Sequence, residues 1–209
     1  MGRVILVRHG ETVWNAEGRM QGHTDVALSE RGVRQAYLTS DRLRGVPLEA
    51  VYSSDLTRAS ATAEVVAAPH GLSVVTTPAL REACLGAWQG RTVKEAEEMD
   101  ADLVALWRQN SLEHRPPGGE RLEEVAARAV PAVRSIAEKH ADGAVAVVAH
   151  GGPIKTVICW AIGAPLSCMR HIRLDNGSIS VIRFRADRVE LETLNDTCHL
   201  SEANATPVF

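Results

Sequence analysis

The chain of 209 residues is long enough for one well-buried domain and short for two, so we expect a single domain over residues 1–209. Its hydrophobic fraction of 45% and charged fraction of 23% are typical of a globular protein, and no apolar run approaches membrane-spanning length. The formal net charge of -3, with lysine and arginine spread along the chain, is not that of a nucleic-acid-binding protein. We therefore expect neither a nucleic acid nor a membrane as a partner.

The beginning of the chain and its cysteines indicate a compartment. Met1, Gly2 and Arg3 precede a four-residue apolar stretch, which provides neither the long apolar core nor the cleavage site of a secretory signal. The four cysteines are too few for a disulfide framework and lack the short paired spacing of a zinc site. These features predict a cytoplasmic protein with free thiols.

The first predicted element is a buried strand over residues 4–7, which ends abruptly at Arg8 and His9. In open α/β sheets, ligands bind beyond the carboxyl ends of the strands, so both side chains are expected at the mouth of a pocket. Residues 14–25 have the composition of a long loop, and a loop at this position is typical of an active site.

A helix capped by Ser29 and a strand over residues 48–53 come next. Asp55 is then predicted to cap a helix over residues 56–69, with Arg58 in its first turn. The helix dipole disfavours a cation at that place, and an anion that docks at the helix start would explain it. A surface arginine that points into water is the alternative.

After a third strand over residues 72–76, the segment 83–119 is interpreted as a small helical cap inserted over the pocket. It contains two short helices and ends in a Pro-Pro-Gly-Gly stretch. Trp88 and Trp107 are candidates to line the pocket, although a tryptophan in a helical segment more often belongs to a core.

The remaining elements are a helix over residues 120–140, the clearest buried strand at 144–149, and a β-rich tail over 178–193. The buried strand ends in His150 and Gly151, so that a second apolar strand terminates in a His-Gly pair. The two runs of the tail are predicted to form an edge hairpin, which would allow pairing across a homodimer.

Three strand ends thus bring Arg8, His9, Arg58 and His150 to one rim. Two arginines and a histidinium form an anion clamp, and the planar guanidinium suits a phosphoryl group. His9 is the predicted nucleophile, with one ring nitrogen aimed at phosphorus and the other held by a backbone carbonyl. Glu82, beneath the cap, is predicted to protonate the leaving oxygen and then to activate water.

These residues stand in four motifs: 6–12 with Asn15, 52–55 with Arg58 and Thr62, 80–82, and 148–151. Together they resemble the histidine phosphatase superfamily, in its phosphoglycerate mutase-like branch, over nearly the whole chain. The resemblance implies an α/β fold, a three-layer α/β/α sandwich with a mostly parallel central sheet. It also implies a phosphohistidine mechanism that needs neither a metal nor a cofactor.

The same resemblance implies roles for individual residues. His9 would carry the phosphoryl group and Glu82 would act as the acid, while the phosphate is held by Arg8, Arg58 and His150. Further phosphate- and substrate-binding positions are Asn15, Gln21, Gly22 and Gly151, with His23 near the substrate.

The family includes mutases as well as phosphatases, and the sequence favours a phosphatase. Cofactor-dependent phosphoglycerate mutases carry a longer insertion after the acid, whereas Gly86, Trp88 and Gly90 here form the short pattern of the phosphatase branch. A smaller cap gives water easier access, so hydrolysis is expected. The alternatives are a cofactor-dependent phosphoglycerate mutase and a protein that binds a phospho-ligand without catalysis.

The substrate is predicted only as a small phosphorylated metabolite. The tail over 194–200 resembles that of metal-independent phosphoserine phosphatases, and folding back would place His199 near the pocket. Those enzymes have a histidine where this chain has Leu85, which weakens the match. Sugar and glycerate phosphates, α-ribazole phosphate, glucosyl-3-phosphoglycerate and a broad range of phosphomonoesters are the other candidate substrates. For His199, an ordinary tail position is narrowly preferred.

Overall fold

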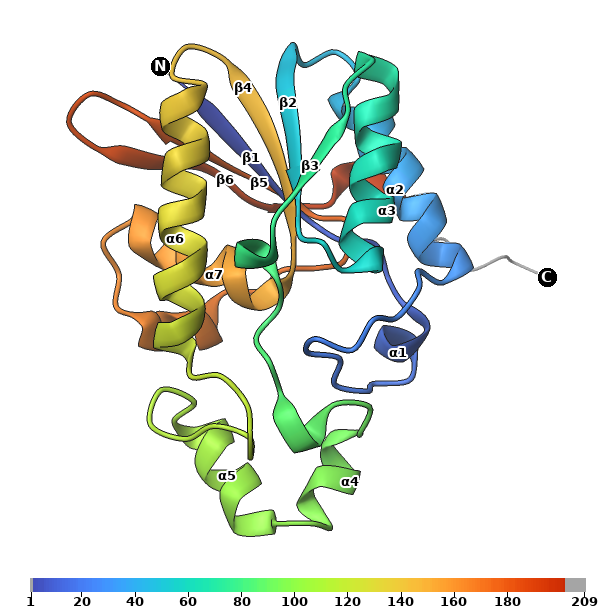
Figure 1. Cartoon of the computed structure of the whole chain (residues 1–209), viewed down its shortest axis with the longest axis vertical. Helices are drawn as coiled ribbons and strands as arrows, with labels where there is room; N and C mark the ends of the chain where they lie inside the picture. The colour runs from blue at the N-terminus through green and yellow to red at the C-terminus, as the bar shows by residue number, and fades with distance from the viewer. Residues whose placement is uncertain (1, 202–209) are drawn as a thin grey trace.

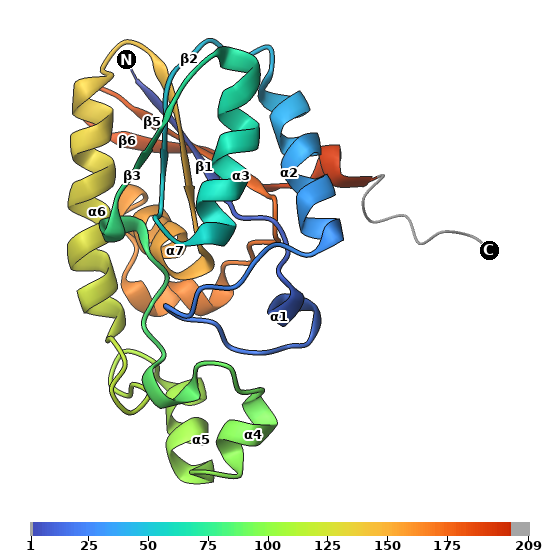
Figure 2. The same cartoon turned by 45° about the vertical axis from the view of Figure 1, so that its right-hand side comes forward.

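The computed structural model describes residues 2–201, in which a six-stranded sheet is covered by helices on both faces (Figures 1 and 2). The ends of the predicted range 1–209 lie outside the described residues. The strands are β1 (Arg3–Arg8), β2 (Leu48–Ser53), β3 (Val74–Thr76), β4 (Ala144–Ala149), β5 (Ile179–Phe184) and β6 (Val189–Asp196). Their order is β3-β2-β4-β1-β5-β6, with the first four strands parallel and the predicted hairpin β5-β6 antiparallel at the edge.

The covering helices are α2 (Glu30–Leu43) and α3 (Thr57–Ala67) on one face, and α6 (Leu122–Lys139) and α7 (Gly151–Ala161) on the other (Figures 1 and 2). This arrangement confirms the predicted three-layer α/β/α fold. No helix within residues 2–201 is long and apolar enough to cross a membrane.

The alternation of side chains along β1 explains why the sheet is covered on both faces. Val4 and Leu6 belong to the core beneath α6 and α7, while Ile5 and Val7 belong to the core beneath α2 and α3. Successive side chains of a strand point to opposite faces, so an uninterrupted apolar run requires a helical layer on each side.

The parallel strands end level with one another, and this places the loops that follow them side by side. Arg8 at the end of β1 pairs with Ala149 at the end of β4, and Ser53 at the end of β2 pairs with Val148. The short helices α1 (Val13–Ala16), α4 (Val93–Glu97) and α5 (Ala101–Gln109) lie beyond this edge (Figure 1).

Helices α4 and α5 pack around a small core of their own. Trp88 is fully buried in it with Ala96 and Val104, and the Trp107 ring meets the Trp88 ring edge-on at 5.3 Å between centroids. Trp88 therefore stabilises the packing of α4 and α5 rather than lining the pocket, which leaves Trp107 as the tryptophan that reaches the cavity wall.

Ser29 caps the N-terminus of helix α2 as predicted, but the prediction that Asp55 caps helix α3 is wrong. Ser29 accepts a hydrogen bond from Gly32 N, whereas Asp55 binds the Arg81 guanidinium with both oxygens, at 2.8 and 2.6 Å. Helix α3 receives its carboxylate from the loop instead, because Asp25 accepts from Thr57 N at 2.8 Å and from Thr57 Oγ1 at 2.6 Å. A cap from 32 residues away leaves no local signal in the sequence.

Candidate active site

His9 lies just beyond β1 and is held in one tautomer. Its Nδ1 donates to the carbonyl of Gly10 at 2.7 Å, so Nε2 carries the lone pair, and the predicted backbone contact is present. Burial, followed by the charges of Arg8 and Arg58, lowers the pKa of His9 well below 6.5. The ring is therefore neutral at pH 7 and available as a nucleophile.

The main chain around His9 is fixed by segments distant in the sequence. His9 N donates to Ala149 O at 3.0 Å, and His9 O accepts from Gly177 N at 3.2 Å and from Asn176 Nδ2 at 3.1 Å. Gly10 N donates to Thr62 Oγ1 at 3.1 Å. These bonds hold the loop rigidly at the strand end.

His150, at the start of α7, lies with its ring centroid 5.0 Å from that of His9. Arg58 Nε donates to His150 Nδ1 at 3.2 Å, so the proton of the neutral ring is on Nε2. Burial, then His9 and the two arginines, lowers the pKa of His150 well below 6.5. The predicted histidinium is thus a neutral imidazole, because buried positive neighbours disfavour a further charge, yet it still offers an N–H.

The two arginines are fixed by backbone carbonyls. Arg58, in the first turn of α3, is buried and donates to Thr24 O at 2.9 Å and to Gly22 O at 2.7 Å. Arg8 donates through Nη1 to Leu174 O at 2.6 Å. Carbonyls at these distances orient the guanidinium groups without neutralising them, so the site keeps its positive charge.

Two buried donors in this cluster have no hydrogen-bond partner in the structure: Arg8 Nε and His150 Nε2. Buried polar groups are nearly always satisfied, and an exception calls for an explanation. An anion beside His9 would accept from both. The pocket thus offers two buried donors to an acceptor beside His9.

Asn15 adds a donor to the cluster. Its Oδ1 accepts from Thr12 N and Thr12 Oγ1, both at 3.1 Å, and from Asn176 Nδ2 at 3.2 Å. Because the oxygen is occupied, the amide NH₂ of Asn15 is the part left for the cavity that this residue lines.

Glu82 lies in a stretch with neither helix nor strand, and its carboxylate is held by two backbone amides. Oε1 accepts from Ala83 N at 2.8 Å and from Gly152 N at 3.0 Å, in the first turn of α7. The backbone carbonyl of Glu82 accepts from His23 Nε2 at 2.8 Å. His23 therefore supports the segment that carries Glu82 from its backbone side.

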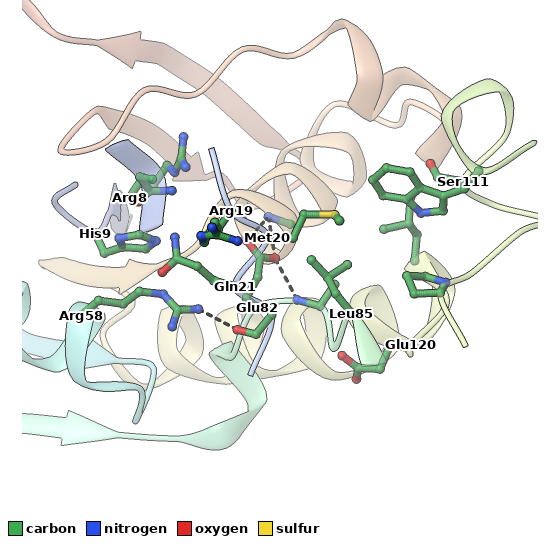
Figure 3. Close-up of a pocket in the computed structure, with 17 residues that line it drawn as sticks. Arg8, His9, Arg19, Met20, Gln21, Arg58, Glu82, Leu85, Ser111 and Glu120 are labelled. Carbon is green, nitrogen blue, oxygen red and sulfur yellow. Dashed lines mark hydrogen bonds between the residues drawn. The ribbon is translucent and has the colours of Figure 1, made fainter. Parts of the chain in front are cut away.

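A cavity of about 300 Å³ joins these groups (Figure 3). Seven predicted residues line it: Arg8, His9, Asn15, Gln21, Gly22, Arg58 and Glu82. Figure 3 shows Arg8, His9 and Arg58 at one end and Leu85, Ser111 and Glu120 at the other. The apolar part of the wall consists of Met20, Ala83, Leu85, Trp107, Pro116 and Leu122.

Two predicted residues are not among those that line the cavity. His150 is completely buried beside His9, and Gly152 rather than Gly151 reaches the cavity surface. His199 is also elsewhere, because its Nε2 contacts Gly177 O at 3.1 Å and Thr39 Oγ1 at 3.2 Å. The ordinary tail position preferred for His199 is therefore confirmed.

Several contributors to the site carry no recognisable signal in the sequence. Asn176 and Leu174 come from the segment before β5, and Arg128 comes from the middle of α6. They act through contacts with backbone carbonyls or with another side chain, which carry no motif. The nearest signal was Asn176 itself, a polar residue just before an apolar strand.

A family model described as histidine phosphatase superfamily (branch 1) matches residues 4–197. The chain belongs to the histidine phosphatase superfamily. The motif-based expectation of this superfamily is thereby confirmed.

Relatives in this superfamily are similar over nearly the whole chain. Phosphoglycerate mutase-like protein 4 of Arabidopsis thaliana is 37% identical over 95% of this chain and 87% of its own length. Phosphoserine phosphatase 1 of Hydrogenobacter thermophilus is 36% identical over 97% of this chain and 96% of its own length. The solved structure of YhfR from Bacillus stearothermophilus superimposes with a TM-score of 0.91 at 33% identity, covering 96% of this chain and 100% of that one.

Proposed function

We propose that the chain is a metal-independent phosphomonoesterase that transfers the phosphoryl group of a small metabolite first to His9 and then to water. The observation that carries this proposal is the pair of buried, unpartnered donors, Arg8 Nε and His150 Nε2, beside the lone pair of His9. The cavity would then bring together the bound anion, the nucleophile His9 and the acid Glu82, which also lines it.

In the first step, His9 Nε2 attacks phosphorus and the bond from phosphorus to the leaving oxygen breaks. Glu82, protonated at this stage, gives its proton to that oxygen. Arg8, Arg58 and His150, with the Asn15 amide, donate to the equatorial oxygens, where charge must be stabilised in phosphoryl transfer.

In the second step, water attacks the phosphohistidine. The Glu82 carboxylate takes the water proton, the bond from phosphorus to nitrogen breaks, and His9 returns to its neutral form. Inorganic phosphate leaves and Glu82 is protonated again. The arginines supply the positive charge that a metal ion supplies in other phosphoryl-transfer sites.

Hydrolysis is favoured over mutase chemistry by the charges around the cavity. A mutase that uses a bisphosphate must bind a second anionic group. Apart from Arg8 and Arg58, the arginine among the lining residues is Arg19, which already contacts Glu17 at 2.9 Å and Glu95 at 2.8 Å. The mutase remains the second candidate, because a relative carries a mutase-like name.

The first test is hydrolysis of p-nitrophenyl phosphate in excess EDTA. We expect nitrophenol release at a rate that EDTA leaves unchanged, because arginines and imidazole supply the charge stabilisation. A protein that only binds phospho-ligands would release none. In a parallel assay with 3-phosphoglycerate and 2,3-bisphosphoglycerate, efficient interconversion without net phosphate release would establish the mutase instead.

The physiological substrate is proposed only by class. A cavity of about 300 Å³ with a polar end and a partly apolar outer wall favours small phosphomonoesters, and phosphoserine and sugar or glycerate phosphates are the candidates. Comparing kcat/KM over a panel of such phosphomonoesters would order these substrates.

Gly152 provides a test of the acid that does not alter the acid itself. A methyl group at Gly152 would stand 2.2 Å from Glu82 Oε1, whereas one at Gly151 would stand an ordinary 3.7 Å from Oε2. We therefore expect Gly152→Ala to displace the carboxylate and to lower kcat/KM for phenyl phosphate, whose leaving group needs the proton, about tenfold or more, with Gly151→Ala closer to the parent.

Both glycines lie in the first turn of α7, where alanine is tolerated, so thermal unfolding should remain near that of the parent in both variants. Equal kinetics of the two variants would contradict the position assigned to the Glu82 carboxylate.

A further inference from the structure

Arg128, in the middle of α6, binds the backbone of the segment that carries Glu82. Its Nη1 donates to Ala79 O at 3.0 Å and to Arg81 O at 2.6 Å, and its Nη2 donates to Glu82 O at 2.8 Å. Residues 81–85 form neither helix nor strand, so no regular hydrogen-bond ladder fixes this stretch. Arg128 constrains this backbone from a helix of the central fold.

The same guanidinium forms a two-point ion pair with Glu120, through Nε at 3.0 Å and Nη2 at 2.9 Å. Glu120 in turn accepts from Cys84 N at 2.8 Å. Arg128 thus binds the backbone carbonyls of Ala79, Arg81 and Glu82, and Glu120 binds the backbone amide of Cys84, two residues after Glu82. Both partners of the pair lie largely out of solvent, with side chains 20% and 23% exposed.

Arg128 is itself well anchored. Val125 and Ala129, on either side of it in α6, are completely buried, and Ala129 belongs to the core between this helix and the sheet. The planar guanidinium presents five donors in a fixed fork, which a lysine ammonium does not reproduce. Arg128 therefore connects the backbone of the Glu82 segment to helix α6, in addition to the contacts that Gly152 N and His23 make with Glu82.

We propose that Arg128 is a positioning residue for Glu82, which fixes the distance between the carboxyl group and the leaving oxygen without touching the substrate. This inference rests on the proposed function, in which Glu82 protonates that oxygen. A displaced acid matters little when the leaving group departs easily as an anion, and matters greatly when the leaving group needs the proton. The decrease in kcat/KM when Arg128 is replaced should therefore depend on the leaving group.

The test measures kcat/KM for p-nitrophenyl phosphate and for phenyl phosphate, whose leaving group is the poorer one. For Arg128→Lys, we expect a loss of about tenfold with phenyl phosphate and less than about twofold with p-nitrophenyl phosphate. Glu82→Gln should show the same preference with a larger amplitude. Arg134→Lys is the matched control, because Arg134 is an exposed residue of the same helix and lies over Trp160.

Arg128→Met serves as a second variant, and thermal unfolding confirms that each protein is folded at the assay temperature. Equal losses with both esters, in a folded Arg128 variant, would overturn the positioning role. If Glu82→Gln depends on the leaving group and Arg128→Lys does not, the inference alone fails. If Glu82→Gln shows no such dependence, the acid assignment fails and the inference fails with it.

Discussion

Replacing His9 with alanine is expected to lower kcat/KM for p-nitrophenyl phosphate by at least about 10³-fold, because the variant has no atom to accept the phosphoryl group. The fold should persist. The His9 side chain makes one hydrogen bond, to the carbonyl of the adjacent Gly10, and its loss leaves the neighbouring backbone bonds in place. Steady-state kinetics on protein with a native unfolding transition provide the measurement.

His140→Ala is the matched control for this variant. His140 contacts Tyr52 Oη at 3.1 Å and Glu49 Oε2 at 3.0 Å. It follows α6 just before β4 begins, and therefore lies at the end of the strands opposite to His9. Its removal should leave kcat/KM within about threefold of the parent. A similar rate for His9→Ala and the parent would show that phosphoryl transfer does not pass through His9.

Replacing Arg58 with methionine is expected to cost about 10³-fold in kcat/KM, the range found when an arginine that stabilises a phosphoryl transition state is removed. Two effects combine. The phosphate loses a guanidinium. His150 Nδ1 also loses the hydrogen bond from Arg58 Nε, which keeps the proton of the His150 ring on Nε2. The variant should also be less stable, by about 1 to 3 kcal/mol for each of the carbonyls of Gly22 and Thr24 that loses its donor.

The pH profile of the same variant provides a more specific test. His9 attacks as the neutral ring, so activity falls as the pH drops through the pKa of His9. Burial, Arg8 and Arg58 hold that pKa well below 6.5, which places the acid limb of kcat/KM for the parent well below pH 6.5. Without the Arg58 charge the pKa of His9 rises, and the acid limb should move to higher pH.

That shift is measured against the parent with the same substrate, so that titration of the phosphate itself cancels. An acid limb at the same pH in parent and Arg58→Met would contradict the electrostatic account of His9, even if the rate loss were as large as expected.

The sequence was a good guide to the parts of the site that follow strand ends. Arg8, His9 and His150 come directly after buried apolar strands, and parallel strands must bring such residues to one edge. The sheet order was not predictable in detail, because pairing between distant strands is decided by tertiary packing. The three-layer arrangement was predictable, because β1 and β4 are apolar on both faces.

The sequence failed where contacts span a long stretch of chain. Asp55 has the composition and place of a helix cap, yet Arg81 binds it and Asp25 caps α3 instead. Asn176 reaches the His9 carbonyl from 167 residues away. Local preference is a weak guide when a charged partner or a folded-back loop competes for the same group.

The protonation of His150 is a further point that composition did not reveal. Two arginines and a histidine suggest a triply charged clamp, but the Arg58 N–H aimed at His150 Nδ1 requires an unprotonated nitrogen there. The direction of a single hydrogen bond thus decides which form of the ring the site contains.

Acid-free trapping of the phosphoenzyme tests the central claim most directly. The protein is mixed with a phosphomonoester, quenched in alkaline denaturant, digested, and its peptides are analysed by mass spectrometry. We expect one phosphoryl group on the peptide that contains His9, lost on mild acid treatment and absent from His9→Ala. Turnover without any phosphorylated peptide, or a phosphoryl group on a different residue, would contradict it.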